Sequence, residues 1–220
     1  MIHPYYWEAI AELCEHQTIR CVGCQTNLSF TVSEFAAQVS NCIKKLRLWC
    51  SFHPSQTRID EFLSQCARLR DFGIRFCVGA VGDSVSGNIN ILTELRRCLP
   101  DDVYFWINAL ERHKYTVEEQ RAYQEIDPLF SLETASFDAD PSLCSAGRNS
   151  LFVEADGSAY ACNVSRVRLG SIYGDLIRGN VCMAKECKCY LAYANRIDVP
   201  QISIFGENLP FRIPDSMLHP

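Results

Sequence analysis

The chain has 220 residues, 48% of them hydrophobic, and a formal net charge of -5. This length suits one large domain, or a medium domain with a small second one. The acidic balance supplies no broad basic surface, which argues against nucleic acid as a partner. No apolar run is long enough to cross a membrane, and the N-terminus lacks the basic and apolar segments of a secretory signal. We therefore expect a cytoplasmic protein that does not bind membranes.

From the N-terminus to about residue 135, short apolar runs alternate with amphipathic stretches, which is the pattern of parallel α/β units. The pattern predicts strands within residues 19–29, 46–52, 74–81 and 103–110, and helices over 5–16, from about 33, over 58–70 and over 91–98. Gly73 is placed to end one helix and Pro100 to stop another. Right-handed crossovers between such units give either a doubly wound sheet or part of a barrel, and periodicity alone does not choose between them.

After residue 135 the composition shifts towards small residues and cysteine. An Asp156-Gly157 pair lies between two β-like runs and predicts a hairpin with a two-residue turn, because both central positions of that turn need φ > 0. In this register Ala155 pairs with Ser158, and Leu151 lies opposite Cys162. Residues 197–220 contain four prolines and no helical period, so we expect a tail that wraps the surface.

Thirteen cysteines are an odd number in a chain too large to need disulfides, and the cytoplasm keeps thiols reduced. Cys21 and Cys24 form a CxxC pair, which is typical of a redox motif or of half a zinc site completed by Cys14 and His16. Because residues three apart in a strand point to opposite faces, we favour a plain strand position for this pair. Six cysteines have the spacing of small hydrophobic residues and are expected to fill the core, namely Cys14, Cys42, Cys50, Cys66, Cys77 and Cys98.

Five further cysteines lie in the last third of the chain, namely Cys144, Cys162, Cys182, Cys187 and Cys189. Their neighbours are turn formers and polar residues, and exposed thiols without a function invite oxidation. Thiolates are soft ligands that bind zinc or iron–sulfur clusters. Because the chain has no paired CxxC knuckles in this region, zinc is the less favoured metal, although it stays a competitor. The five cysteines therefore predict a metal centre.

The spacing of Cys144, Gly157 and Cys162, with twelve and then four residues between them, resembles the opening of the SPASM or twitch domain of radical SAM enzymes. Residues 168–172 resemble the Gly-Asn-Ile segment that follows in this domain, with Ser171 in place of Asn. Five cysteines are too few for the two clusters of a full SPASM domain. The resemblance therefore implies one auxiliary [4Fe-4S] cluster, held by Cys144, Cys162 and two of the three later cysteines.

Residues 1–135 are similar to the later part of the family's barrel, so the resemblance implies a partial TIM-like (β/α) barrel without its first strands. His3-Pro4 resembles the segment that follows the family's Gly-Gly-Glu-Pro motif. Ser51 resembles a serine that lies near the ribose of S-adenosylmethionine (SAM), and a loop-capping role is the alternative for it. In this reading residues 136–196 form a small β-hairpin iron–sulfur domain and residues 197–220 a C-terminal tail.

The chain departs from the family in two motifs. It contains neither Cys-x3-Cys-x2-Cys, whose thiolates leave one iron open to SAM, nor Gly-Gly-Glu-Pro. The resemblance thus implies a chain without the family's N-terminal quarter, with an exposed edge strand and no means of generating the 5′-deoxyadenosyl radical. The family uses this radical to modify peptides or small molecules, and the substrate stays open here. Two alternatives remain: a non-catalytic zinc- or cluster-binding module that binds a partner protein at the open barrel edge, and a chain without stable function.

Overall fold

The protein is represented by a computed structural model, which describes residues 5–83, 87–110, 113–179, 182–187 and 194–214. The chain divides into two compact units. Unit 1 comprises Met1–Phe130 and Phe211–Pro220, and unit 2 comprises Ser131–Pro210. The expected tail over 197–220 is therefore shared between the two units.

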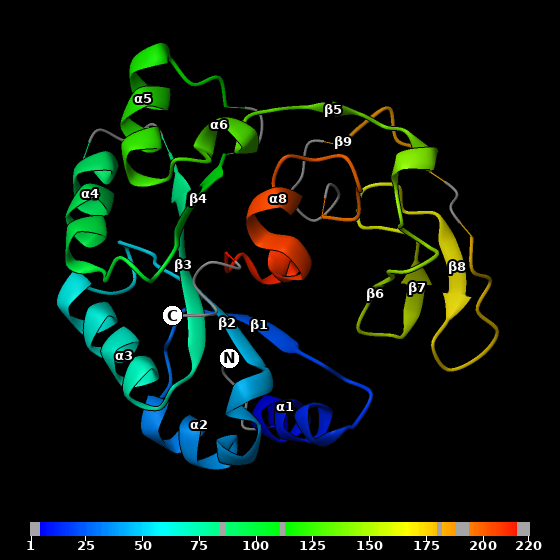
Figure 1. Ribbon diagram of the computed structural model, residues 1–220, viewed down its shortest axis with the longest axis horizontal. Helices are drawn as coiled ribbons and strands as arrows, with labels where there is room; N and C mark the ends of the chain where they lie inside the picture. The colour runs from blue at the N-terminus through cyan, green and yellow to red at the C-terminus, as the bar shows by residue number, and fades with distance from the viewer. Residues whose placement is uncertain (1–4, 84–86, 111–112, 180–181, 188–193, 215–220) are drawn as a thin grey trace. The chain divides into compact units, whose positions relative to one another are not determined.

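Unit 1 is built on a four-stranded parallel sheet whose order, β1-β2-β3-β4, is the order of the strands in the chain (Figure 1). The strands are β1 (Val22–Thr26), β2 (Leu46–Ser51), β3 (Arg75–Gly82) and β4 (Phe105–Ala109). All four were predicted from the apolar runs, and the structure confirms them. Each crossover leads to the neighbouring strand, so the order does not reverse within this sheet.

Helices follow the strands of unit 1, and α1 to α4 lie along one side of the sheet in Figure 1. Their bounds are α1 (Tyr5–Glu15), α2 (Val32–Gln38), α3 (Ile59–Asp71), α4 (Asn88–Cys98), α5 (Val117–Ile126) and α6 (Phe130–Glu133), with the 3-10 helix η1 (Ser40–Lys45) before β2. Gly73 ends α3 as predicted, with φ of 70°. Its N–H donates to the carbonyl of Arg70 at 2.8 Å, and the N–H of Ile74 donates to that of Leu69 at 2.9 Å. These two bonds satisfy carbonyls that the helix end would otherwise leave open.

The two faces of this sheet differ because successive side chains of a strand point to opposite sides. On the helix side, Leu48, Val78 and Ile107 are completely buried in one large apolar core. On the other side, Trp49 and Cys77 pack with Ile213 from the C-terminal segment. The sheet of unit 1 is thus covered by helices on one face and by a short stretch of chain on the other.

The helix α5 was not predicted, although the chain carries a signal for it. The Thr116 hydroxyl oxygen accepts from the Glu119 N–H at 3.1 Å, and the Thr116 N–H donates to the Glu119 carboxylate at 2.8 Å. This reciprocal capping box starts the helix, and its Thr-x-x-Glu pattern is visible in the sequence.

Asp127 follows α5 and is completely buried. Its carboxylate accepts from the Tyr104 hydroxyl at 2.6 Å, from the Ile107 N–H at 2.9 Å and from the Leu129 N–H at 3.0 Å. Burial raises the pKa of this carboxyl group, and the three hydrogen bonds oppose that rise. Asp127 thereby ties the end of α5 to strand β4.

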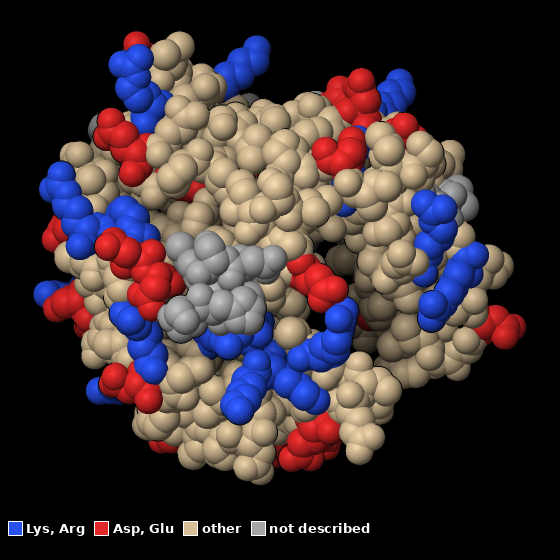
Figure 2. All heavy atoms as spheres, in the orientation of Figure 1, with Lys and Arg blue, Asp and Glu red and all other residues tan. Residues whose placement is uncertain are grey.

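Unit 2 contains small antiparallel sheets. The strands β6 (Phe152–Val153), β7 (Ser158–Tyr160) and β8 (Arg168–Ser171) form one sheet, and β5 (Phe137–Asp138) pairs with β9 (Glu186–Cys187). The protein is therefore a mixed α/β structure, with a parallel sheet in unit 1 and antiparallel sheets in unit 2. Acidic and basic side chains are interspersed over the face shown in Figure 2. Among the described helices, none combines the length and apolar character that a membrane crossing requires.

The predicted hairpin exists, but its register is shifted by one residue. Phe152 pairs with Tyr160, whereas a two-residue turn would place Phe152 opposite Ala161. The prediction was wrong because the loop has three residues: the Gly157 N–H donates to the Glu154 carbonyl at 2.9 Å, and Gly157 has φ of 82°. A glycine in the left-handed region after a tight turn is the usual geometry of a three-residue hairpin loop.

The C-terminal region also differs from its prediction, because it contains helical turns. They are α8 (Ile202–Phe205) and η3 (Gly206–Phe211). A further short helical turn, η2 (Pro141–Leu143), lies earlier in the chain, before Cys144. Phe205 and Leu209 are 0% and 3% exposed. Burial of these apolar side chains stabilises turns that are too short to show a helical period in the sequence.

Gly79 provides a test of packing on the second face of the unit 1 sheet. A Cβ at this position would lie 2.1 Å from Nε1 of Trp49. We expect Gly79→Ala to lower the free energy of unfolding by about 1–3 kcal/mol, because the partly buried indole of Trp49 must move. Gly174→Ala, where no atom lies within 4 Å of the added carbon, is the control. Urea unfolding measures both, and equal stability of the two variants would contradict this packing.

Candidate metal centre

Four of the five predicted cysteine ligands fall in described parts of unit 2. Cys144 follows η2, Cys162 follows β7, and Cys187 is in β9; these three are 9%, 8% and 7% exposed. Cys182 is half-buried and precedes β9. Cys189 lies outside the described residues. The twelve described cysteines form no disulfide with one another.

The fold brings these four thiols into one neighbourhood, although they are spread over 44 residues of sequence, from 144 to 187. Cys144 and Cys162 pack in one buried cluster with Ala146. Burial raises the pKa of Cys144, and the nearby thiols of Cys162 and Cys182 add to this rise. Burial also raises the pKa of Cys187, with smaller contributions from Cys182 and Cys144. Among the described residues, however, no group of three or more His, Cys, Asp or Glu side chains is arranged so that it could hold a metal ion.

Two of the thiols accept hydrogen bonds from the backbone just after them. The Ser165 N–H donates to Sγ of Cys162 at 3.1 Å. The Ala146 N–H donates to the sulfur of Cys144 and lowers the pKa of that thiol against the effect of burial. N–H groups directed at sulfur stabilise the thiolate form, which is the form that binds metals.

The backbone of Arg196 holds Cys144 in place. These two residues form an isolated antiparallel bridge. On either side of it, the Ser145 N–H donates to the Asn195 carbonyl at 2.8 Å, and the Ile197 N–H donates to the Leu143 carbonyl at 3.0 Å. A segment some fifty residues further along the chain thus fixes the backbone at the first cysteine.

The side chain of Arg196 reaches Cys187 and is only 6% exposed as a residue. Its Nε and Nη2 donate to the Asp198 carboxylate at 2.7 and 2.6 Å, and its Nη1 donates to the Asp138 carbonyl. It lies 5.6 Å from the centroid of Phe137, which pairs with Cys187 across β5 and β9. A hydrogen bond from the guanidinium lowers the pKa of Cys187 against the effect of burial. Arg196 therefore links two of the cysteines, one through its backbone and one through its side chain.

The residues present fit a soft, negatively charged centre. A thiolate-ligated iron–sulfur cluster places negative charge on its sulfur atoms, and hydrogen bonds to these atoms stabilise it and tune its potential. Here backbone N–H groups face Cys162 and Cys144, and a buried cation faces Cys187. A tetrahedral zinc site would use the same thiolates.

The early cysteines behave as core residues with one exception. Cys14, Cys42, Cys50, Cys66 and Cys77 are between 0% and 5% exposed, which confirms the prediction for these five. Burial raises the pKa of Cys66 and that of Cys77 to about 12, which disfavours the reactive thiolate form of both. Cys98 is exposed, and the prediction for it was wrong because the last residue of α4 extends beyond the core.

The CxxC pair of unit 1 lies at the start of strand β1, with Cys21 directly before the strand and Cys24 inside it. Cys24 lies within β1, as predicted, and burial raises the pKa of its thiol to about 11. A reactive CxxC cysteine has a lowered pKa, because the attacking species is the thiolate. Cys24 therefore behaves as a residue of the strand.

Ser51 ends β2 and is 7% exposed. Its hydroxyl oxygen accepts from Nε2 of Gln25 at 2.8 Å, so the neighbouring strand orients it. Its place at the carboxyl end of a parallel strand is compatible with ligand binding and with a capping role. His3-Pro4, the other SAM-related feature, lies outside the described residues.

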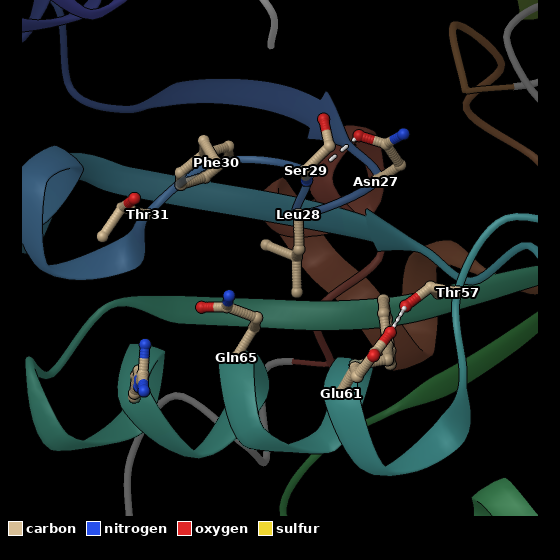
Figure 3. A pocket seen from close by; sticks show the side chains of 10 residues that line it. Asn27, Leu28, Ser29, Phe30, Thr31, Thr57, Glu61 and Gln65 are labelled. Atoms are coloured by element: carbon tan, nitrogen blue, oxygen red, sulfur yellow. Dashed lines mark hydrogen bonds between the residues drawn. The ribbon is translucent and has the colours of Figure 1, made fainter.

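A separate polar cavity of about 430 Å³ opens between the loop after β1 and helix α3 (Figure 3). Figure 3 shows Gln65 and Leu28 directed towards it, with Thr57 bonded to Glu61 at one end. Its lining residues are 27–31, Thr57, Glu61, Phe62, Gln65 and Arg68. None of them is a cysteine, so this cavity is not part of the candidate metal centre.

The sequence pattern did not identify Arg196 and Asp198. An Arg-x-Asp pair near the start of a proline-containing tail is indistinguishable from a surface ion pair until its burial is known. Comparison of the chain with protein-family models, with curated proteins and with solved structures finds no match in any of the three. The interpretation of this centre therefore depends on the residues themselves.

Arg196→Gln tests how far unit 2 depends on the buried guanidinium. The Arg196 and Asp198 side chains are 5% and 34% exposed, whereas those of the Arg166–Glu154 pair are 49% and 36% exposed. We expect Arg196→Gln to lower the free energy of unfolding by about 1–3 kcal/mol, because the buried side chain loses its hydrogen bonds to the Asp198 carboxylate and the Asp138 carbonyl. Arg166→Gln is expected to cost less than about 1 kcal/mol. Urea unfolding of the metal-free protein compares the two variants, and equal losses would show that the burial of Arg196 adds nothing.

Proposed function

We propose that this chain is a radical-SAM-like iron–sulfur protein that binds one auxiliary [4Fe-4S] cluster in unit 2. The proposed ligands are Cys144, Cys162, Cys182 and Cys187. The observation that supports this choice is their shared neighbourhood, in which backbone N–H groups and the Arg196 guanidinium face three of the sulfur atoms. Cys189 is the fifth cysteine of the group. Separate substitution of Cys187 and of Cys189 shows which of the two is a ligand.

When bound, such a cluster supplies one-electron transfer or an anchoring point for a substrate. The residues around it have distinct roles. Ser165 and Ala146 donate backbone N–H groups to two sulfur atoms, and Arg196 donates to a third. Cys144, Cys162 and Cys187 are 9%, 8% and 7% exposed, which limits the access of water to these residues. The hydrogen bonds and the guanidinium favour an anionic centre over isolated neutral thiols, whereas burial alone favours the neutral thiols.

For unit 1 we propose a partial TIM-like (β/α) barrel. The order β1-β2-β3-β4 without reversal supports this fold, as do the helices α1 to α4 along one side of the sheet (Figure 1). A doubly wound sheet instead reverses its strand order at a switch point and carries helices on both faces. In this proposal unit 1 provides the surface for a peptide or small-molecule substrate, and Ser51 lies at the edge where SAM would bind. The numerous thiols suit a reducing, cytoplasmic setting.

A second candidate function is a non-catalytic cluster- or zinc-binding module. The absence of a Cys-x3-Cys-x2-Cys motif from the sequence favours it, because that motif is what leaves one iron open to SAM. Among the described strands, β1 pairs only with β2 and offers an edge to a partner protein. The two candidates share the centre in unit 2 and differ in whether radical chemistry occurs.

Anaerobic reconstitution with iron and sulfide tests the cluster. We expect about four iron and four sulfide per chain, with the visible absorbance of an iron–sulfur cluster. Cys144→Ala and Cys162→Ala are expected to lose most of this iron, whereas Cys66→Ala keeps it and costs about 1 kcal/mol of core packing. Cys187→Ala is expected to lose iron and Cys189→Ala to retain it. A protein that takes up zinc but no sulfide would overturn the cluster and leave the zinc-binding module.

The lack of a Cys-x3-Cys-x2-Cys motif in the sequence leads to an expectation about cleavage of SAM. Incubation of the reconstituted chain with SAM and dithionite should form no more 5′-deoxyadenosine than buffer does, because no Cys-x3-Cys-x2-Cys motif is present to bind SAM at iron. Chromatography of the nucleosides measures the product. Catalytic formation of 5′-deoxyadenosine would reject the non-catalytic module.

A further inference from the structure

The face of the unit 1 sheet opposite the helices carries an aromatic and polar set that the proposed function does not use. Trp49 of β2 and Trp106 and Asn108 of β4 point to this face, because they alternate with the core residues of their strands. Gly79 of β3 lies between them, in register with Trp106. A side chain at Gly79 would displace the Trp49 indole, so the glycine leaves room for the ring to lie over the strand.

Arg212 fills the space between the two indoles. Its guanidinium carbon lies 3.8 Å from the ring centroid of Trp49 and 4.2 Å from that of Trp106. Its Nη1 donates to the Asn108 side-chain oxygen, and the residue is only 2% exposed. A flat, weakly hydrated cation stacked between aromatic faces is a favourable arrangement that a lysine ammonium matches less well.

The backbone of Arg212, within the segment of residues 211–214, has a left-handed conformation. Arg212 has φ of 55°, which is rare for a residue with a side chain. Such strain persists only where the surroundings impose it, and it occurs often at ligand clamps and switches. The neighbours of Arg212 contribute modest contacts: the Cys77 thiol donates to the Phe211 carbonyl at 3.5 Å, and Ile213 packs on Cys77.

We propose that Trp49, Trp106 and Asn108 form a binding site for the arginine side chain of a peptide, and that Arg212 fills this site as an internal competitor. The two indoles recognise the flat cation and Asn108 provides its acceptor. Arg212, an arginine on a polypeptide chain, occupies the site in the structure, so an arginine of a peptide is the ligand that we infer. Asn108 also lies near the carboxyl end of β4, at the edge of a parallel sheet where α/β proteins bind their ligands. The site does not involve the cysteines of unit 2.

Arg212 competes with any external arginine for the site, and this competition sets the affinities expected for the wild type and for a variant without the Arg212 side chain. A tethered side chain acts at a high effective concentration, so an external arginine binds weakly to the intact chain. Removing the Arg212 side chain should expose the site. The two indoles are then direct reporters of binding, since the chain contains only three tryptophans.

The test measures tryptophan fluorescence of full-length Arg212→Ala during titration with N-acetylarginine amide. We expect saturable binding, at least about tenfold tighter than to the wild-type chain. N-acetylcitrulline amide has the same shape without the charge and should bind at least about tenfold more weakly. An acetylated Gly-Arg-Gly peptide should bind more tightly than the single residue. Arg70→Ala, which removes an exposed arginine paired with Asp102, should bind as the wild type does.

Several results would overturn the proposal. One is a folded Arg212→Ala protein that binds no arginine amide, or binds citrulline equally well. Another is unchanged binding after Trp106→Leu is added. If the tripeptide binds no better than the amide, a peptide is not the ligand. Should Arg212→Ala fail to fold, Arg212→Lys replaces it, because an ammonium stacks poorly and should yield to arginine amide more readily than Arg212 does. Equal affinity of Arg212→Lys and wild type would then reject the site.

Discussion

Arginine remains ionised in proteins, so its guanidinium can be buried only where other groups replace the water around it. Arg196 in unit 2 and Arg212 in unit 1 are 6% and 2% exposed, and the surroundings of each are arranged to meet this requirement. The Arg196 guanidinium contacts the Asp198 carboxylate, the Asp138 carbonyl and the Cys187 thiol. The Arg212 guanidinium lies between the rings of Trp49 and Trp106 and donates to the side-chain oxygen of Asn108. Each arginine thereby draws distant parts of its own unit together.

In unit 2 this constraint bears directly on the cysteines. The backbone of Arg196 bridges to Cys144 and its side chain donates to Cys187. The contacts that hold this cation in place therefore also fix the positions of two thiols. The cation favours the ionised form of the nearby sulfur, while burial favours the neutral form. A bound cluster would satisfy both, because it keeps thiolates ionised in a largely buried site. The proposed function thus explains why a charged side chain is buried among cysteines.

Local signals predicted much of the structure, and their limits are physical. The apolar runs located β1 to β4, and Gly73 marked the end of α3 because only its left-handed conformation allows the observed hydrogen bonds. The Asp156-Gly157 pair identified the hairpin but not its register, since the same pair suits two-residue and three-residue loops. Cys98 resembled the other core cysteines in spacing, yet the end of a helix need not face the core.

The sequence by itself determined the strands β1 to β4 and the helices α1 to α4 of unit 1, the presence of a hairpin in unit 2 and the group of late cysteines as candidate ligands. These features follow from periodicity, turn chemistry and thiol chemistry, which act over a few residues. Only the tertiary structure decided that Arg196 lies beside Cys187 and that Arg212 lies between two tryptophans. Arg212 and its two tryptophans lie far apart in the chain, and the partners of both arginines are chosen by burial and charge in three dimensions, for which a linear pattern carries no signal.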